Sequence, residues 1–284
     1  MRLMFVILLK RNSMTLNVSL LVPDGIVMAC DSLATVSQAL KQQKMNVTAK
    51  CGKCGDQFEI KDVEVPPMSV PSSTWAYSQK LFPVGKRVGL ATYGAGFVNG
   101  RSIYNHIVEL GPKLAGDGGA TKDFDAVASA IKDYFHQQLH AEMKNFGQNP
   151  DLLPDNWFHF GFQVVGFAKG QNGDWAAQRR HIKIGKKAES EELNGVRCYV
   201  SGDTSVVTLL WSAQGAVANY GAFSLQDAID YAKFLIRTTA DYQRFSGNMP
   251  TVGGEIDIAL VTNHRGFQWI AQKELYRKLD AERG

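Results

Sequence analysis

Residues 15–31, TLNVSLLVPDGIVMACD, decide the fold, because their pattern predicts a β-hairpin. Apolar residues alternate through Leu16, Val18 and Leu20, and Pro-Asp-Gly at 23–25 favours a turn. Residues 26–29 form a short apolar return strand. Since the two strands run antiparallel, the carboxylate of Asp31 is expected to return to the point where the first strand begins, at Thr15.

Thr15 is a candidate nucleophile if it is the first residue of the mature chain. A threonine hydroxyl is a weak nucleophile, but an α-amino group on the same residue, with a pKa of about 7.7–8.0, can accept its proton. Met14 precedes it, and methionine aminopeptidase removes methionine in front of a small residue. We expect residues 1–14 to be a mis-assigned start or a short propeptide. The alternative is an ordinary surface-strand threonine.

A second hairpin supplies further candidates. Lys80 opens the strand 80–84, Gly85-Lys86 makes a turn, and residues 88–92 return towards Tyr93-Gly94-Ala95-Gly96. A glycine at a strand end lets a substrate carbonyl approach the backbone N–H, as an oxyanion donor requires. Each feature alone is weak, since a strand lysine is usually solvated and Gly-Ala-Gly is usually a turn.

Taken together, these residues resemble the active-site signature of proteasome β-subunits and their bacterial relatives. The resemblance rests on Thr15, Asp31-Ser32-x-Ala34-Thr35, Lys80 and Gly94, and it continues downstream in the family's order to about residue 275 through Val165-Gly166-Phe167, Tyr199-Val200-Ser201-Gly202-Asp203 and residues 253–260. The chain is most similar to the single-subunit proteasome homologues of beta-proteobacteria. The two-tier bacterial peptidase that works with an unfoldase is the next nearest.

The resemblance implies an α+β fold, the four-layer αββα sandwich of two antiparallel sheets found in N-terminal-nucleophile (Ntn) hydrolases. It also implies a threonine-type endopeptidase. Thr15 would attack the peptide carbonyl with its own amine as base, Lys80 beside Asp31 would lower the pKa of the hydroxyl, Gly94 N–H would bind the oxyanion, and Ser201 would orient the proton transfer.

Substrate-binding residues follow from the same resemblance. The backbones of Thr35 and Gly94 are expected to hold the substrate as an added strand. The walls of the pocket are expected to be Ala34, Phe82, Thr92 and Gly96, which favours a medium apolar side chain on the acyl side of the cut. Relatives assemble as double rings, and some are fed by a hexameric AAA+ ATPase, so a homo-oligomeric ring and such an unfoldase are the implied partners.

The sequence departs from the family pattern in two places. The family's Asp-x-x-Ser-Gly before the penultimate strand has no match, since Asp241 and Ser246-Gly247 have the wrong spacing. An insertion at about residues 37–75 is the second departure, and it is expected to project on the active-site side. Two alternatives therefore stay open: an Ntn amidase acting on a small amide, and a catalytically silent ring or scaffold subunit.

Cysteine and charge content limit the other classes. The four cysteines favour a reducing cytosol and hence a cytoplasmic protein. Cys51-x-x-Cys54 supplies only two zinc ligands, and nothing places His136 and His140 beside it, so we expect no metal and no cofactor. The net charge is +4, and from Thr15 onward 28 basic groups face 27 acidic ones, so the charge gives no case for nucleic acid or membrane as partner.

The remaining elements fit one domain spanning residues 15–284. Helices are expected at 99–115, 123–146, 204–213 and 224–245, the last with a capping pair at Ser224 and Asp227. Gly111-Pro112 is expected to end or kink the first helix. Strands are expected near 159–168, 175–184, 197–202, 255–263 and 267–272.

Overall fold

The computed structural model describes residues 15–40, 43–50, 57–65, 68–115, 123–169, 172–193, 195, 197–213, 218–247 and 249–273. The proposed leader at 1–14, and Cys51 and Cys54, lie outside these residues. By its internal contacts the chain divides into two compact units, with residues 35–74 separate from the rest. The smaller unit holds two strand pairs, one formed by β3 (Ala34–Leu40) and β6 (Met68–Trp75), the other by the antiparallel strands β4 (Gln43–Lys50) and β5 (Gln57–Val65).

The larger unit contains two five-stranded sheets. The first has the order β14 (Cys198–Gly202), β1 (Leu16–Val22), β2 (Gly25–Asp31), β15 (Ile256–Thr262) and β16 (Gly266–Ala271). The second has the order β13 (Ala188–Glu192), β12 (Trp175–Gly185), β11 (Phe158–Lys169), β8 (Val88–Gly94) and β7 (Leu81–Val84). Every pairing within the two sheets is antiparallel. Both predicted hairpins are confirmed.

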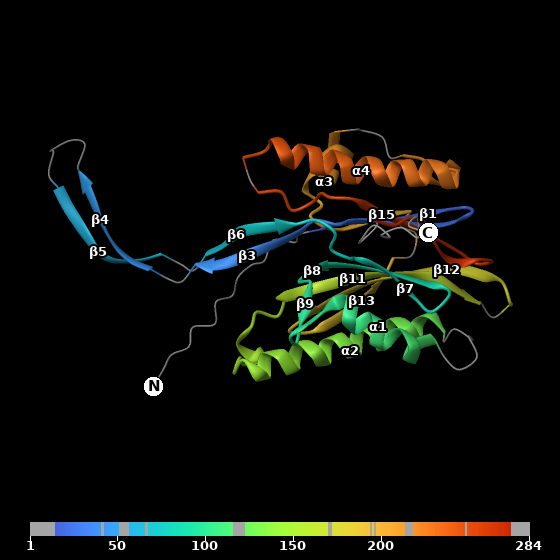
Figure 1. Cartoon of the computed structure of the whole chain (residues 1–284), viewed down its shortest axis with the longest axis horizontal. Coiled ribbons are helices and arrows are strands. Elements are labelled where there is room, and N and C mark those ends of the chain that lie inside the picture. The colour runs from blue at the N-terminus through green and yellow to red at the C-terminus, as the bar shows by residue number, and fades with distance from the viewer. Residues whose placement is uncertain are drawn as a thin grey trace, which may run out of the picture. The chain divides into compact units, whose positions relative to one another are not determined.

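Helices cover the outer face of each sheet in this unit (Figure 1). On the first sheet, α4 (Leu225–Phe245) contacts β1, β2 and β15, and α3 (Ser205–Ala213) contacts α4. On the second sheet, α2 (Phe124–Asn145) contacts β11, β12 and β13, and α1 (Ile103–Ala115) contacts β7. Strands β1, β2 and β15 of the first sheet also contact β8 of the second, so the inner faces pack together.

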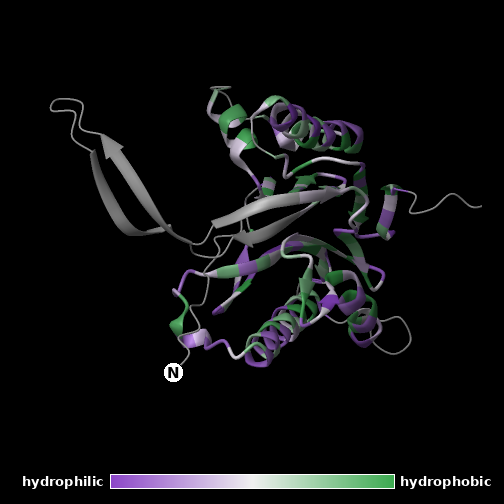
Figure 2. Cartoon of the chain, turned by 60° about the vertical axis from the view of Figure 1, so that its left-hand side comes forward, coloured by the Kyte–Doolittle hydropathy of each residue, from purple (hydrophilic) through white to green (hydrophobic). Residues whose placement is uncertain are grey.

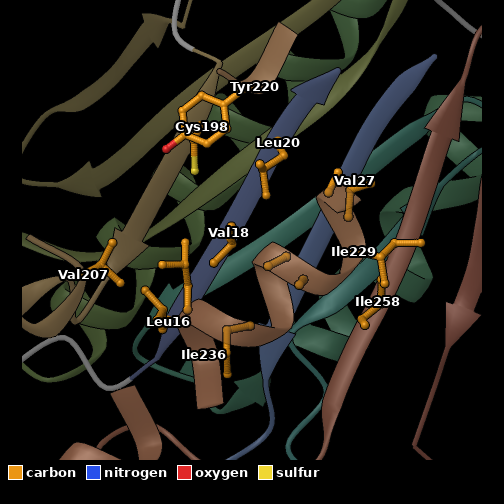
Figure 3. Packing of buried hydrophobic residues seen from close by; sticks show 14 of the residues in the cluster. Leu16, Val18, Leu20, Val27, Cys198, Val207, Tyr220, Ile229, Ile236 and Ile258 are labelled. Carbon is orange, nitrogen blue, oxygen red and sulfur yellow. The ribbon is translucent and has the colours of Figure 1, made fainter. Parts of the chain in front are cut away.

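Alternation along β1 decides which side chains enter each layer. Leu16, Val18 and Leu20 pack with Ile229 and Ile236 of α4 in one apolar cluster (Figure 3). The intervening residues of β1 therefore point to the opposite face, towards the second sheet. The helices carry both hydrophobic and hydrophilic residues, as expected for helices with one buried side (Figure 2).

The observed helix boundaries agree with the predicted ones at some ends and differ at others. Ser224 and Asp227 form the predicted capping box, in which Ser224 Oγ accepts from Asp227 N and Asp227 accepts from Ser224 N. The first helix begins at Ile103 rather than at 99, because residues 97–102 pair as the short strands β9 (Phe97–Val98) and β10 (Arg101–Ser102). That helix continues through Pro112 to Ala115 rather than ending there. Cys30 and Cys198 are buried in the core, and both are free thiols.

Candidate active site

Asp31, at the end of β2, accepts hydrogen bonds from four groups, three of which come from other parts of the chain. Its Oδ1 accepts hydrogen bonds from Leu16 N and Lys80 Nζ, both at 3.0 Å. Its Oδ2 accepts from Leu33 N at 3.1 Å and from Gly253 N at 3.0 Å. Complete burial raises the pKa of Asp31 despite the opposing effect of Lys80 and of these N–H groups. Its ionised form therefore depends on these partners.

Lys80 is a buried cation held in one orientation. Its side chain is 6% exposed, and its Nζ donates to Asp31 Oδ1 and, at 2.6 Å, to the carbonyl of Leu33. The residue directly precedes β7, and its own carbonyl accepts from Thr92 N of β8 at 2.9 Å. Backbone pairing and the ion pair together fix the ammonium beside the end of β2, which is where the sequence analysis expected it.

Thr15 directly precedes β1 and is 2% exposed. The next residue is Leu16, whose N–H donates to Asp31. The carbonyl of Thr15 accepts a hydrogen bond from Asp203 N at 2.6 Å. Gly202 makes this approach possible, because it has a φ of +98° and a Cβ there would lie 1.8 Å from Thr15 O. The backbone of Thr15 is thus fixed between β2 and β14.

Ser201 lies opposite Asn17 in the pairing of β14 with β1. Its Oγ accepts a hydrogen bond of 2.8 Å from Nε2 of Gln163, a fully buried residue of β11. The side chains of Asn17 and Ser19 are also fully buried, and among the described residues no protein group binds their polar side-chain atoms. A polar zone therefore extends between the sheets behind Thr15, in a position where apolar packing is the rule.

Gly94 ends β8 with a φ of +89°, which favours glycine. A Cβ at this position would lie 2.8 Å from His159 O and from Phe160 Cα of β11. Close packing of two backbones therefore fixes the residue, and its role as oxyanion donor stays a prediction.

The predicted substrate-binding residues lie in different surroundings. Phe82 and Thr92 are buried, Phe82 beside the ring of Tyr104, and Thr92 Oγ1 donates to the carbonyl of Gly161 at 3.4 Å. Ala34 is half-buried and Gly96 is exposed. Thr35 begins the smaller unit, so its placement relative to Thr15 is not described. The assignment of these residues to a substrate pocket stays a prediction.

A brace around Asp203 was missed by the sequence reasoning. Asp203 Oδ2 accepts from Gln243 Nε2 at 2.9 Å and from Thr251 Oγ1 at 2.7 Å, while Gln243 Oε1 accepts from the N–H groups of Thr251 and Val252. This brace ties the end of α4 to the loop that delivers Gly253 to Asp31. Its only signal in the sequence was the polarity of Asp203 beside Ser201-Gly202.

Asp241 and Ser246 are the residues of the sequence nearest to the Asp-x-x-Ser-Gly pattern, at the wrong spacing. They border a surface hollow at the end of α4 together with Tyr242 and Phe245. Ser246 Oγ donates to Gln243 O at 2.8 Å and so completes a helix end. No assignment of the family pair follows from either residue.

Within the described residues, no group of three or more histidine, cysteine or acidic side chains is placed to hold a metal ion. His136 and His140 lie one turn apart on α2, with ring centroids 4.3 Å from each other. None of the helices in the described part of the chain combines the length and apolar character needed to cross a bilayer.

In the larger unit, two antiparallel sheets lie between helices, and Thr15, Asp31 and Lys80 lie around one strand end. A solved structure of an Anbu mutant from Hyphomicrobium sp. strain MC1 is similar to this chain, with a TM-score of 0.50 and 15% sequence identity. The alignment covers 93% of this chain and 88% of that one, so it spans nearly the whole length of both chains. Neither a protein-family model nor a curated protein sequence matches the chain.

Proposed function

We propose that this chain is a threonine-type endopeptidase subunit of a self-compartmentalising, proteasome-like ring, with Thr15 as N-terminal nucleophile. The observation that carries the proposal is the buried pair of Lys80 and Asp31 at the residue where β1 begins. A buried ion pair contributes little net stability, so a lysine fixed at this position favours a chemical role. The fold of Ntn hydrolases, in its full four-layer αββα form, agrees with the two packed sheets and their outer helices.

The proposed reaction begins with attack of Thr15 Oγ on the carbonyl carbon of a peptide bond. The α-amine of Thr15 takes the hydroxyl proton and then gives it to the leaving amine as the C–N bond breaks. The product is an ester of Thr15, which water hydrolyses to release the acid and restore the hydroxyl. Metal and cofactor have no part in this proposal.

Lys80 and Gly94 stabilise the negative charge that develops during the proposed reaction. An ammonium has three N–H donors, two of which Lys80 directs to Asp31 and Leu33. We assign the third to Thr15 Oγ, where it would stabilise the developing alkoxide. Gly94 N–H would bind the oxyanion, and loss of such a donor costs roughly 2.7–4 kcal/mol in other hydrolases. Ser201 would orient the amine of Thr15.

The implied substrate is an unfolded polypeptide or a peptide, held as an added strand by the backbones of Thr35 and Gly94. Ala34, Phe82, Thr92 and Gly96 would select a medium apolar side chain. A double ring of identical subunits would enclose the nucleophiles, and an AAA+ unfoldase would supply substrate. A cytoplasmic location goes with this assembly.

The test compares four proteins: the chain beginning at Met1, the chain beginning at Thr15, and Thr15→Ala and Thr15→Ser variants of the latter. Intact-mass and N-terminal analysis reports whether the amine of Thr15 is unblocked. We expect peptide hydrolysis, and labelling by a peptide vinyl sulfone, wherever Thr15 is first. Thr15→Ala abolishes both, and Thr15→Ser retains part of the activity.

Other outcomes identify the alternatives. Folded protein with an unblocked Thr15 that neither hydrolyses peptides nor forms an adduct would be a scaffold subunit. An active monomer or dimer in gel filtration, acting on small amides only, would be an Ntn amidase.

A further inference from the structure

A chain of three aromatic side chains joins the two strands that carry Gly94 and Ser201. Two of them, Tyr93 and His181, are buried, and the third, Tyr199, is half-buried. Tyr93, the residue before Gly94 on β8, contacts Nε2 of His181 through its hydroxyl at 2.6 Å. The hydroxyl of Tyr199, two residues before Ser201 on β14, contacts Nδ1 of the same imidazole at 2.7 Å. His181 belongs to β12, so the connection spans both sheets.

The backbone of β11 is shaped to admit this connection. Tyr93 lies opposite Gly161 of β11, and Gly161 in turn lies opposite Lys183 of β12. A Cβ on Gly161 would lie 2.4 Å from the hydroxyl oxygen of Tyr93. Glycine therefore leaves the space through which the tyrosine crosses β11 to reach β12, and the rings of Tyr93 and His181 stack with centroids 5.7 Å apart.

A second side-chain contact links β11 directly to β14. Gln163 lies two residues beyond Gly161, opposite His181, and its Nε2 donates to Ser201 Oγ. Tyr199 and Ser201 lie two residues apart on β14, so they share a face. His181 thus binds Tyr199, and Gln163 binds Ser201, at two neighbouring positions on one face of β14.

The imidazole performs this role in its neutral form. A neutral imidazole has one N–H donor and one acceptor nitrogen, so one tyrosine hydroxyl accepts and the other donates. Burial lowers the pKa of His181 to about 4, with Lys183 acting in the same direction, and Glu191 lies 3.9 Å away at the exposed edge. Burial raises the pKa of Tyr93, and it raises that of Tyr199 to about 12, so both hydroxyls keep their protons.

We propose that His181 is a positioning residue. Through Tyr93 it fixes the end of β8, which carries Gly94, and through Tyr199 it fixes β14, which carries Ser201, so that it sets the position of the two strands relative to each other. The catalytic part of this inference rests on the proposed function. Misplacement of a reacting geometry by about 1 Å costs up to about 100-fold in rate, so loss of the connection is expected to lower kcat rather than to weaken substrate binding.

The experiment compares His181→Leu, His181→Gln and His181→Asn in the oligomeric protein that begins at Thr15. Glutamine places an amide near the Nε2 position and keeps the contact with Tyr93, whereas asparagine places one near Nδ1 and keeps the contact with Tyr199. His106→Leu is the matched control, since His106 is also buried and bonded to a tyrosine hydroxyl, that of Tyr134, and to the carbonyl of Val98.

We expect His181→Leu to lower kcat for a fluorogenic peptide about tenfold or more, with KM within about twofold. We expect His181→Gln and His181→Asn to recover part of that loss. His106→Leu is expected to lower the melting temperature and leave kcat within about twofold. Equal kcat values for His181→Leu and His106→Leu would overturn the inference.

A second readout is independent of activity. Hydrogen–deuterium exchange of the Gly94 and Ser201 amides is expected to accelerate about tenfold or more in His181→Leu and to stay near the wild-type rate in His106→Leu. If the wild-type protein shows no hydrolysis that depends on Thr15, the proposed function fails while this measurement still decides the positioning role. Unchanged exchange at both amides refutes it.

Discussion

Replacing Lys273 by methionine is expected to destabilise the protein strongly, because it leaves a buried carboxylate without its cation. Lys273 Nζ binds Asp257 Oδ2, and both side chains are 0% exposed. Asp257 pairs with Cys30 in the register of β15 and β2, one residue along from the pairing of Ile256 with Asp31. Breaking a buried pair by removal of one partner costs about 3–5 kcal/mol.

A double-mutant cycle separates the interaction free energy of Lys273 and Asp257 from the effect that each substitution has by itself. Asp257→Leu combined with Lys273→Met removes both charges, and we expect the double variant to recover most of the loss. Lys113→Met is the surface control, because Lys113 is 64% exposed in its pair with Glu109, and its removal is expected to cost less than about 0.5 kcal/mol. Urea denaturation followed by tryptophan fluorescence, with the slope checked for constancy, gives each free energy of unfolding.

Two results would refute this reasoning. A loss below about 1 kcal/mol for Lys273→Met would mean that water or another group replaces the lost cation. A double variant whose loss equals the sum of the single losses would mean that the two charges do not act as a pair.

Three further predictions concern other parts of the fold. Burial lowers the pKa of His181 from its ordinary 6.5 to about 4 on folding. Folding with a neutral imidazole therefore contributes roughly 3 kcal/mol to the free energy of unfolding above pH 6.5, and this contribution is lost as the pH falls from 6.5 to 4. A pH series of urea denaturation should show this loss in the wild type, and an equal loss in His181→Gln would contradict the prediction. Gly202→Ala is expected to lower kcat/KM up to about 100-fold, because the new Cβ displaces the backbone of Thr15, and peptide hydrolysis within about threefold of wild type would count against this geometry. Ser224→Ala removes an acceptor for Asp227 N and is expected to cost about 1 kcal/mol of unfolding free energy, while Ser224→Asp, which keeps the acceptor, should cost less.

Local patterns in the sequence predicted many of the elements correctly. The alternation through Leu16, Val18 and Leu20 marked β1, and Pro-Asp-Gly marked its turn, because side-chain period and turn chemistry act between neighbours. The capping box at Ser224 was visible for the same reason. By contrast, β13 was missed: it reads Ala-Glu-Ser-Glu-Glu, carries no apolar alternation, and becomes a strand only because β12 offers it an edge.

The sequence by itself determined the hairpin that brings Asp31 back to Thr15, since that conclusion needs only strand direction and turn chemistry. Lys80 was indicated by the resemblance to proteasome β-subunits. The tertiary structure alone decided that Gly253, 222 residues away in sequence, binds Asp31, and that Gln163 and His181 reach the strand of Ser201. These contacts form where two sheets pack face to face. The pairing of side chains across that interface depends on the register and spacing of both sheets, which no local pattern encodes.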